Sequence, residues 1–105
     1  MAKARRIMRV RISSRARGDV IEILGYIDTK STRGAIVVKK AICAAIRRIG
    51  DFPNGGRPLK RDHTIQSIPV NHYPYLLYWT IESKEAWILH VRHAKRQAWD
   101  GKSAL

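Results

Sequence analysis

A short cationic segment near the C-terminus contains the side chains best suited to bind an anion or react with one. Arg92, His93, Lys95 and Arg96 directly follow an alternating apolar run, and Trp99 closes the segment. Arginine and lysine carry stable positive charges, whereas histidine titrates near neutral pH and can donate or accept a proton. Because a core strand is a rigid support, we expect these side chains to form a concentrated positive surface at its end.

A second basic group lies between Asp51 and His63, where Pro53, Pro58 and a Gly-Gly pair predict a loop. We interpret the two groups together as the functional surface, which comprises Arg57, Lys60, Arg61, Arg92, His93, Lys95, Arg96 and Trp99. Such cations can hold a phosphate group, but cleavage of RNA also needs a base and an acid. Catalytic residues are therefore assigned only for the case of a nuclease, in which they would be Lys60, Arg61, Arg92 and His93.

The remaining reactive residue types do not form a recognisable site. His63 and His72 lie in turn-like segments and His90 on a strand, without metal-ligand spacing to acidic residues, so no metal and no cofactor are expected. Cys43 is the only cysteine, which excludes an intramolecular disulfide. We expect it to be a buried structural thiol in an apolar helix.

Length and charge limit the classes of protein to consider. The 105 residues predict one domain over residues 1–105, with a loose tail at about 101–105. Twenty-one Lys and Arg against eight Asp and Glu give a formal charge of +13, which implies an anionic partner. The basic N-terminus lacks the apolar run of a secretory signal, and no stretch reaches membrane-spanning length. We therefore expect a cytoplasmic protein that does not bind membranes.

Hydrophobic periodicity predicts the elements that hold the cationic groups. Met8, Val10 and Ile12 alternate with basic residues as in a half-buried strand. Ser13 then suits the N-cap of a helix, and either Ser31 or Thr32 suits that of a second helix. Gly50 suits a left-handed position at the end of the second helix. Three strands follow, at about residues 65–70, 73–82 and 86–93.

This order predicts an α+β fold of the form β-α-α-β-β-β, in which a helical hairpin packs on a small antiparallel sheet. The last three strands should form an antiparallel meander, because consecutive strands usually neighbour one another. The first strand joins the sheet to bury its apolar side. The helices should cover one side, leaving the opposite side partly open for the basic residues.

At this point the sequence resembles the RelE/ParE superfamily of type II toxin–antitoxin toxins over nearly its whole length. The resemblance is carried by RISSRARGDVIEILGYI, DFPNGGRPL, QSIPVNHYPYLLYWTIES and ILHVRHAKRQAW, in this order and spacing. It implies a small α+β domain with a helical hairpin against an antiparallel sheet. It also implies neutralisation by a cognate antitoxin, received in the groove between the hairpin and the sheet edge.

The superfamily has two branches with different targets. RelE-like members are ribosome-dependent endoribonucleases that cut messenger RNA, whereas ParE-like members poison DNA gyrase. This chain has Ile68 and Pro69 where the nuclease subgroup that uses histidine has arginine, and its tail lacks a tyrosine. These departures favour the ParE-like branch.

The leading hypothesis is therefore a ParE-like toxin that inhibits DNA gyrase and is held inactive by its antitoxin. The alternative is a RelE-like mRNA endoribonuclease acting on the ribosome through the same surface. A non-toxic basic RNA-binding protein is a third interpretation, which composition alone would allow.

Overall fold

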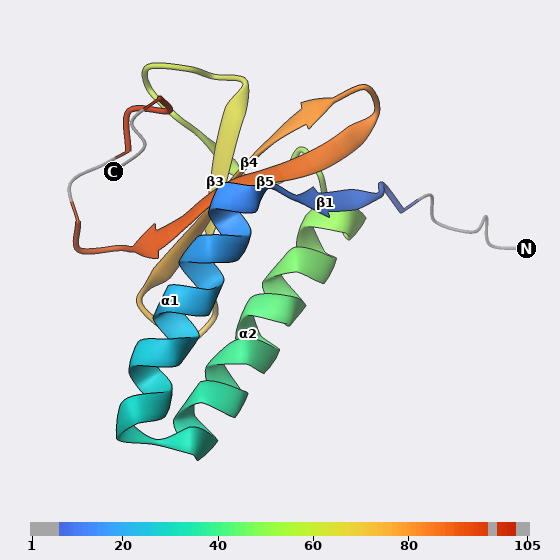
Figure 1. Ribbon diagram of the computed structural model, residues 1–105. Coiled ribbons are helices and arrows are strands. Elements are labelled where there is room, and N and C mark those ends of the chain that lie inside the picture. The colour runs from blue at the N-terminus through green and yellow to red at the C-terminus, as the bar shows by residue number, and fades with distance from the viewer. Residues whose placement is uncertain (1–6, 97–98, 103–105) are drawn as a thin grey trace, which may run out of the picture.

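The computed structural model describes residues 7–96 and 99–102 (Figure 1). Its elements are β1 (Val10–Ile12), α1 (Ser14–Lys30), α2 (Thr32–Asp51), β2 (Arg57–Pro58), β3 (Ile65–Pro69), β4 (Tyr75–Glu82) and β5 (Glu85–His93). The predicted order is confirmed, with the two-residue strand β2 added inside the predicted loop. The basic residues of the extreme N-terminus and residues 103–105 of the predicted loose tail lie outside the described residues.

Serine side chains begin both helices. The Ser13 hydroxyl accepts the Ala16 N–H at 3.1 Å, and the Ser31 hydroxyl accepts the Gly34 N–H at 2.9 Å. Ser31 also ends α1, because its own N–H donates to the Ile27 carbonyl. Ser13 is thus confirmed as the N-cap of α1. Of the two candidates Ser31 and Thr32, Ser31 is the N-cap of α2. In the described ranges, neither helix is long and apolar enough to cross a membrane.

Two expectations about α2 are wrong. Gly50 does not end the helix in a left-handed conformation, because α2 continues to Asp51. A Cβ on Gly50 would lie 3.1 Å from the Met8 carbonyl oxygen, and the Met8 N–H donates to the Gly50 carbonyl at 3.0 Å. The small side chain therefore permits close approach of the chain entering β1. Cys43 is exposed rather than buried, because it lies on the outer face of the helix.

The sheet has the strand order β1-β5-β4-β3-β2. The pairs β3–β4 and β4–β5 are antiparallel, which confirms the predicted meander. β1 joins the sheet as predicted, but it pairs parallel to β5, with Val10 opposite Ala86 and Ile12 opposite Ile88. The sheet is therefore mixed rather than wholly antiparallel. A period-two pattern is the same in either strand direction, so the sequence did not reveal this one.

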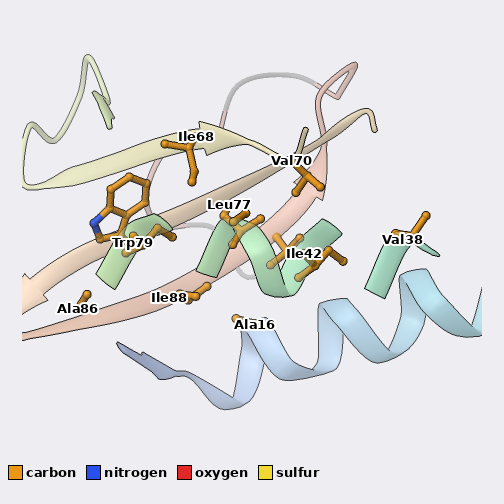
Figure 2. Close-up of a cluster of buried hydrophobic side chains, with 12 residues drawn as sticks. Ala16, Val38, Ile42, Ile68, Val70, Leu77, Trp79, Ala86 and Ile88 are labelled. Carbon is orange, nitrogen blue, oxygen red and sulfur yellow. The ribbon is translucent and has the colours of Figure 1, made fainter. Parts of the chain in front are cut away.

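The main core lies between the helical hairpin and one face of the sheet, and Figure 2 shows its side chains meeting from both layers. The helices contribute Ala16, Val38, Ile42, Ala45 and Ile49, and the strands contribute Ile68, Val70, Leu77, Trp79, Ala86, Ile88 and Val91. Trp79 and Leu77 are fully buried. Burial of one such side chain contributes about 1.5–3 kcal/mol, so this layer fixes the position of β4 and β5.

A bulge in β5 changes which side chains face the core. Tyr78 lies opposite His90 while Trp79 lies opposite Ile88, so Leu89 is the additional residue. Strict alternation would place Ile88 and His90 on one face, but the bulge shifts the register by one residue. As a result Ile88 and Val91 both pack in the main core, and His90 faces the other side of the sheet beside Tyr78.

The sheet face opposite the helices, here called the far face, is covered at its centre. Leu59, Ile65, Tyr78 and Trp99 form a second cluster of buried side chains on it. The tail residues 99–102 lie beside the loop that precedes β3 (Figure 1). The expectation of a partly open face is therefore wrong at the centre, because the segment carrying Trp99 folds back onto it.

Substitution of Gly56 tests the packing of the loop against the core. A Cβ at this position would lie 2.3 Å from Trp79 Cη2 and 2.8 Å from Gln66 Cβ. Because the Trp79 ring is fully buried and cannot move aside, we expect Gly56→Ala to destabilise the protein by about 1–3 kcal/mol. Gly25→Ala is the matched control: its Cβ meets open space in a helix interior, so a gain of about 0.5–1 kcal/mol is expected. Urea unfolding of both variants measures the difference, and equal stability would contradict the packing described.

Candidate functional site

A row of side chains crosses the far face from one edge of the sheet to β5. Arg57 lies opposite Ser67, Ser67 opposite Tyr78, and Tyr78 opposite His90. Because directly opposed residues point to the same face, Arg57 and His90 end one continuous row. In the next row Arg92 lies opposite Leu76 on the same face.

The N-terminal half of α1 docks on the edge of β5 beyond the end of β1. The Ser13 N–H donates to the Ile88 carbonyl at 3.0 Å. Further along the helix, Asp19 Oδ2 accepts the Val91 N–H at 3.0 Å and the His90 imidazole at 2.6 Å. Since β1 ends at Ile12, these side-chain and backbone contacts of α1 satisfy part of an edge that no strand pairs.

His90 is held as a neutral imidazole by its two polar neighbours. The Asp19 carboxylate can only accept, so Nδ1 carries the proton and donates to it. Arg15 Nη2 lies 3.3 Å from Nε2 and donates to its lone pair. Burial lowers the pKa of His90 below its ordinary value, and the nearby charges of Arg15 and Arg92 lower it further, whereas Asp19 acts in the opposite direction. His90 is therefore both buried and hydrogen-bonded.

Trp99 folds back onto this row. Its ring centroid lies 5.1 Å from that of Tyr78 and 4.9 Å from that of His90, and the Arg15 guanidinium lies 5.3 Å from it. The indole is 6% exposed. A cation–π contact contributes about 0.5–2 kcal/mol depending on desolvation, so Arg15 joins the tail to α1 as well as to β5.

The cations predicted at the end of β5 have different environments. Arg92 is only 8% exposed, and its Nε is buried without a hydrogen-bond partner in the described part of the chain. His93 is half-buried: its Nδ1 accepts the Lys95 N–H at 3.0 Å, and its ring packs edge-on against Tyr75. Of the four, only Lys95 and Arg96 are exposed, in the turn that follows the strand. The prediction of four cations presented together to solvent is therefore wrong for Arg92 and His93.

The loop cations lie at the other edge of the sheet. Arg57, Lys60 and Arg61 are exposed on β2 and in the loop after it. β2 is three strand positions from β5, a separation of about 14 Å at the usual spacing. The structure therefore brings Arg57, Arg92 and Trp99 to one face but does not place the two basic groups around a single phosphate position.

Sequence reasoning did not include Arg15, Asp19 or His90 in the functional surface. Asp19 directly precedes Val20, which is partly buried against the main core. An acidic residue at that place in α1 is the signal that could have identified it. Arg15 had no such signal, because its role depends on Trp99 and His90, which are 84 and 75 positions away in the chain.

The His90 environment predicts a pH-dependent stability. The folded state lowers the pKa of His90, so the unfolded chain takes up a proton first as pH falls below about 6.5. Stability is therefore complete above that pH and decreases below it, by at most about 1.4 kcal/mol per pH unit, until the folded protein is protonated as well. Urea unfolding from about pH 7.5 to about pH 5 should show a steeper loss for the wild type than for His90→Gln. The exposed His63→Gln is the control and should retain the wild-type slope; equal slopes in all three proteins would contradict the assignment.

Comparisons with known proteins agree with this architecture. The family model described as "ParE toxin of type II toxin-antitoxin system, parDE" matches residues 10–98. No curated protein matches the chain. Among solved structures, a chain of the "Chromosomal ParDE TA system from P. aeruginosa" is similar, with a TM-score of 0.74 and 15% identity over 86% of this chain and 99% of that one. At this identity the likeness concerns the fold, whereas the family match spans every helix and strand described above. The chain therefore belongs to the ParE toxin family of type II toxin–antitoxin systems.

Proposed function

We propose that this toxin inhibits DNA gyrase by binding it in the cytoplasm, and that its cognate antitoxin prevents this contact. The chain is a ParE-like toxin with an antitoxin as its partner. The single observation that carries the proposal is the match to the ParE family over residues 10–98. Gyrase is the target that the resemblance to ParE-like toxins implies.

The turn after β5 is the part of the surface that we assign to the target. Lys95 and Arg96 are exposed there, and the turn is closed by the Arg96 N–H donating to the His93 carbonyl at 3.1 Å. The Ala94 N–H also donates to the Pro74 carbonyl at 2.7 Å. Two charged side chains on a braced turn can steer and orient a negatively charged partner.

The loop cations Arg57, Lys60 and Arg61 form a second contact in this proposal. They lie across the far face from the turn, with Trp99 packed between the two edges. We assign no direct contact with the target to Arg92, His93 or Trp99. This division of roles follows from their burial.

The geometry gives less support to an mRNA endoribonuclease. The His93 Nδ1 is already used by the Lys95 N–H, and Lys60 and Arg61 follow the strand at the other edge of the sheet. A transferred proton and a bound phosphate would have to be close together. Cleavage of mRNA is therefore one of the outcomes that the experiment on gyrase inhibition must distinguish.

A pocket on the helix side of the sheet fits the antitoxin groove implied by the resemblance. It measures about 300 Å³ and is lined by Arg48, Ile49, Phe52, Gly55, Ile68 and Trp79. Phe52 is 52% exposed at this position. An apolar pocket with one arginine suits an apolar side chain of the antitoxin next to an acidic one.

Charge reversal in the turn tests the assignment of the target surface. We expect Lys95→Glu/Arg96→Glu to inhibit gyrase supercoiling at least about tenfold less than the wild type, the equivalent of about 1.4 kcal/mol of binding. The matched control is Lys39→Glu/Lys40→Glu, which makes the same change of charge at two exposed positions on α2. It should inhibit as the wild type does.

Three results would count against the proposal. Wild-type protein that leaves purified gyrase fully active would exclude gyrase as the target. Codon-positioned cleavage of translated messages, lost in His93→Ala, would establish the ribonuclease alternative. An equal loss in the α2 control would show that net charge, rather than this turn, controls inhibition.

A further inference from the structure

Arg92 is a buried cation whose Nε has no hydrogen-bond partner in the part of the chain that the structure describes. The side chain is more than nine-tenths buried. A guanidinium cannot release its proton at physiological pH, so burial without an acceptor is strongly unfavourable. Native proteins rarely keep such a group without a reason, and a ligand that supplies the acceptor is one such reason.

The neighbouring groups do not neutralise this charge. None of the salt bridges among the described residues includes Arg92. Asp19 is the acid of α1 that contacts β5, and its Oδ2 already accepts from both His90 and Val91. With His90 neutral, Arg15 and Arg92 together carry two positive charges against the single negative charge of Asp19. One further negative charge would balance the cluster.

We propose that Arg92 is the receptor for one carboxylate side chain, a Glu or Asp of the antitoxin, which binds on the far face at the end of β5. The inference rests on the antitoxin as the partner of this toxin, but not on gyrase as its target. It adds a contact on the sheet face opposite the pocket lined by Arg48 and Phe52. The antitoxin therefore engages both faces of the sheet.

The residues around Arg92 favour binding of a carboxylate at the end of a flexible side chain over binding of a nucleic-acid phosphate. Arg92 lies opposite Leu76, which packs against the cluster of Leu59, Ile65, Tyr78 and Trp99. Methylene groups of an acidic side chain can lie against this apolar surface while the carboxylate reaches the buried guanidinium. A sugar-phosphate backbone is too bulky to reach a group that is 8% exposed.

An acidic residue on the same face also disfavours a polyanion. Asp62 lies in the loop against which Gly101 packs. The backbone and hydroxyl of Thr64 hold the pKa of Asp62 below its ordinary value, so it stays ionised. A strand of closely spaced phosphates would extend toward this charge, whereas a single carboxylate at Arg92 would not.

The test uses small probes and Arg92→Met, which keeps the length of the side chain and removes its charge. The probes are N-acetylglutamate amide for a carboxylate and dimethyl phosphate for a phosphodiester, each compared with chloride at equal ionic strength. We expect the glutamate probe to raise the Tm of the wild type more than either other anion. The shift should disappear in Arg92→Met and persist in Arg96→Met, an exposed arginine four residues later.

The probe-free variants give a second readout. Arg92→Met should have the same Tm as the wild type or a higher one, because replacing an unpaired buried charge by an apolar side chain is neutral or stabilising. If Arg92→Met does not fold, Arg92→Gln serves in its place and should likewise lose the glutamate shift. Gyrase inhibition without antitoxin should be retained in either variant, which separates this proposal from the proposed function.

Three outcomes would overturn the inference. A larger shift with dimethyl phosphate would assign the site to nucleic acid. No shift with the glutamate probe, or an equal shift in Arg92→Met, would show that Arg92 binds no carboxylate. A clearly lower Tm of folded Arg92→Met without probe would show that Arg92 has a structural role.

Discussion

The Asp19 carboxylate is the contact on which the arrangement of this toxin depends. It accepts from the Val91 backbone and from the His90 ring, so it fastens α1 to the edge of β5 at the point where β1 has already ended. His90, fixed in this way, accepts from Arg15 and packs against Trp99. The order of dependence therefore runs from a helix to a strand, and from that strand to the C-terminal tail. Removal of the first contact would loosen elements that are far apart in the sequence.

Much of the fold could be predicted from local patterns. The apolar stripes of α1 and α2, the serine caps and the meander of β3 to β5 follow from side-chain periodicity and capping chemistry, which act over a few residues. The parallel direction of β1 and the bulge at Leu89 could not, since both are decided by contacts between distant segments. Because of the bulge, His90 lies on the far face beside Tyr78 although Ile88, two residues earlier, packs in the main core.

The candidate site was predicted less well than the fold, and burial is the reason. Composition identifies cations, but it cannot tell which of them face solvent. Arg92 was grouped with Lys95 and Arg96 because they are close in sequence, yet the first is buried on the sheet and the others project from a turn. Arg9 and Arg11 are different again, because both lie near Glu85 at exposed positions where ion pairs contribute little. A charge of +13 thus consists of groups with distinct energetic roles.

Ser31 has a consequence for how chain length can vary in this protein. It closes α1 with its N–H and opens α2 with its hydroxyl, so Ser31 alone separates Lys30 at the end of α1 from Thr32 at the start of α2. One inserted residue at this junction would rotate α2 by about 100° and turn its apolar stripe away from the sheet. The lengths of the two helices and their junction are therefore fixed together by the packing of α2 on the sheet.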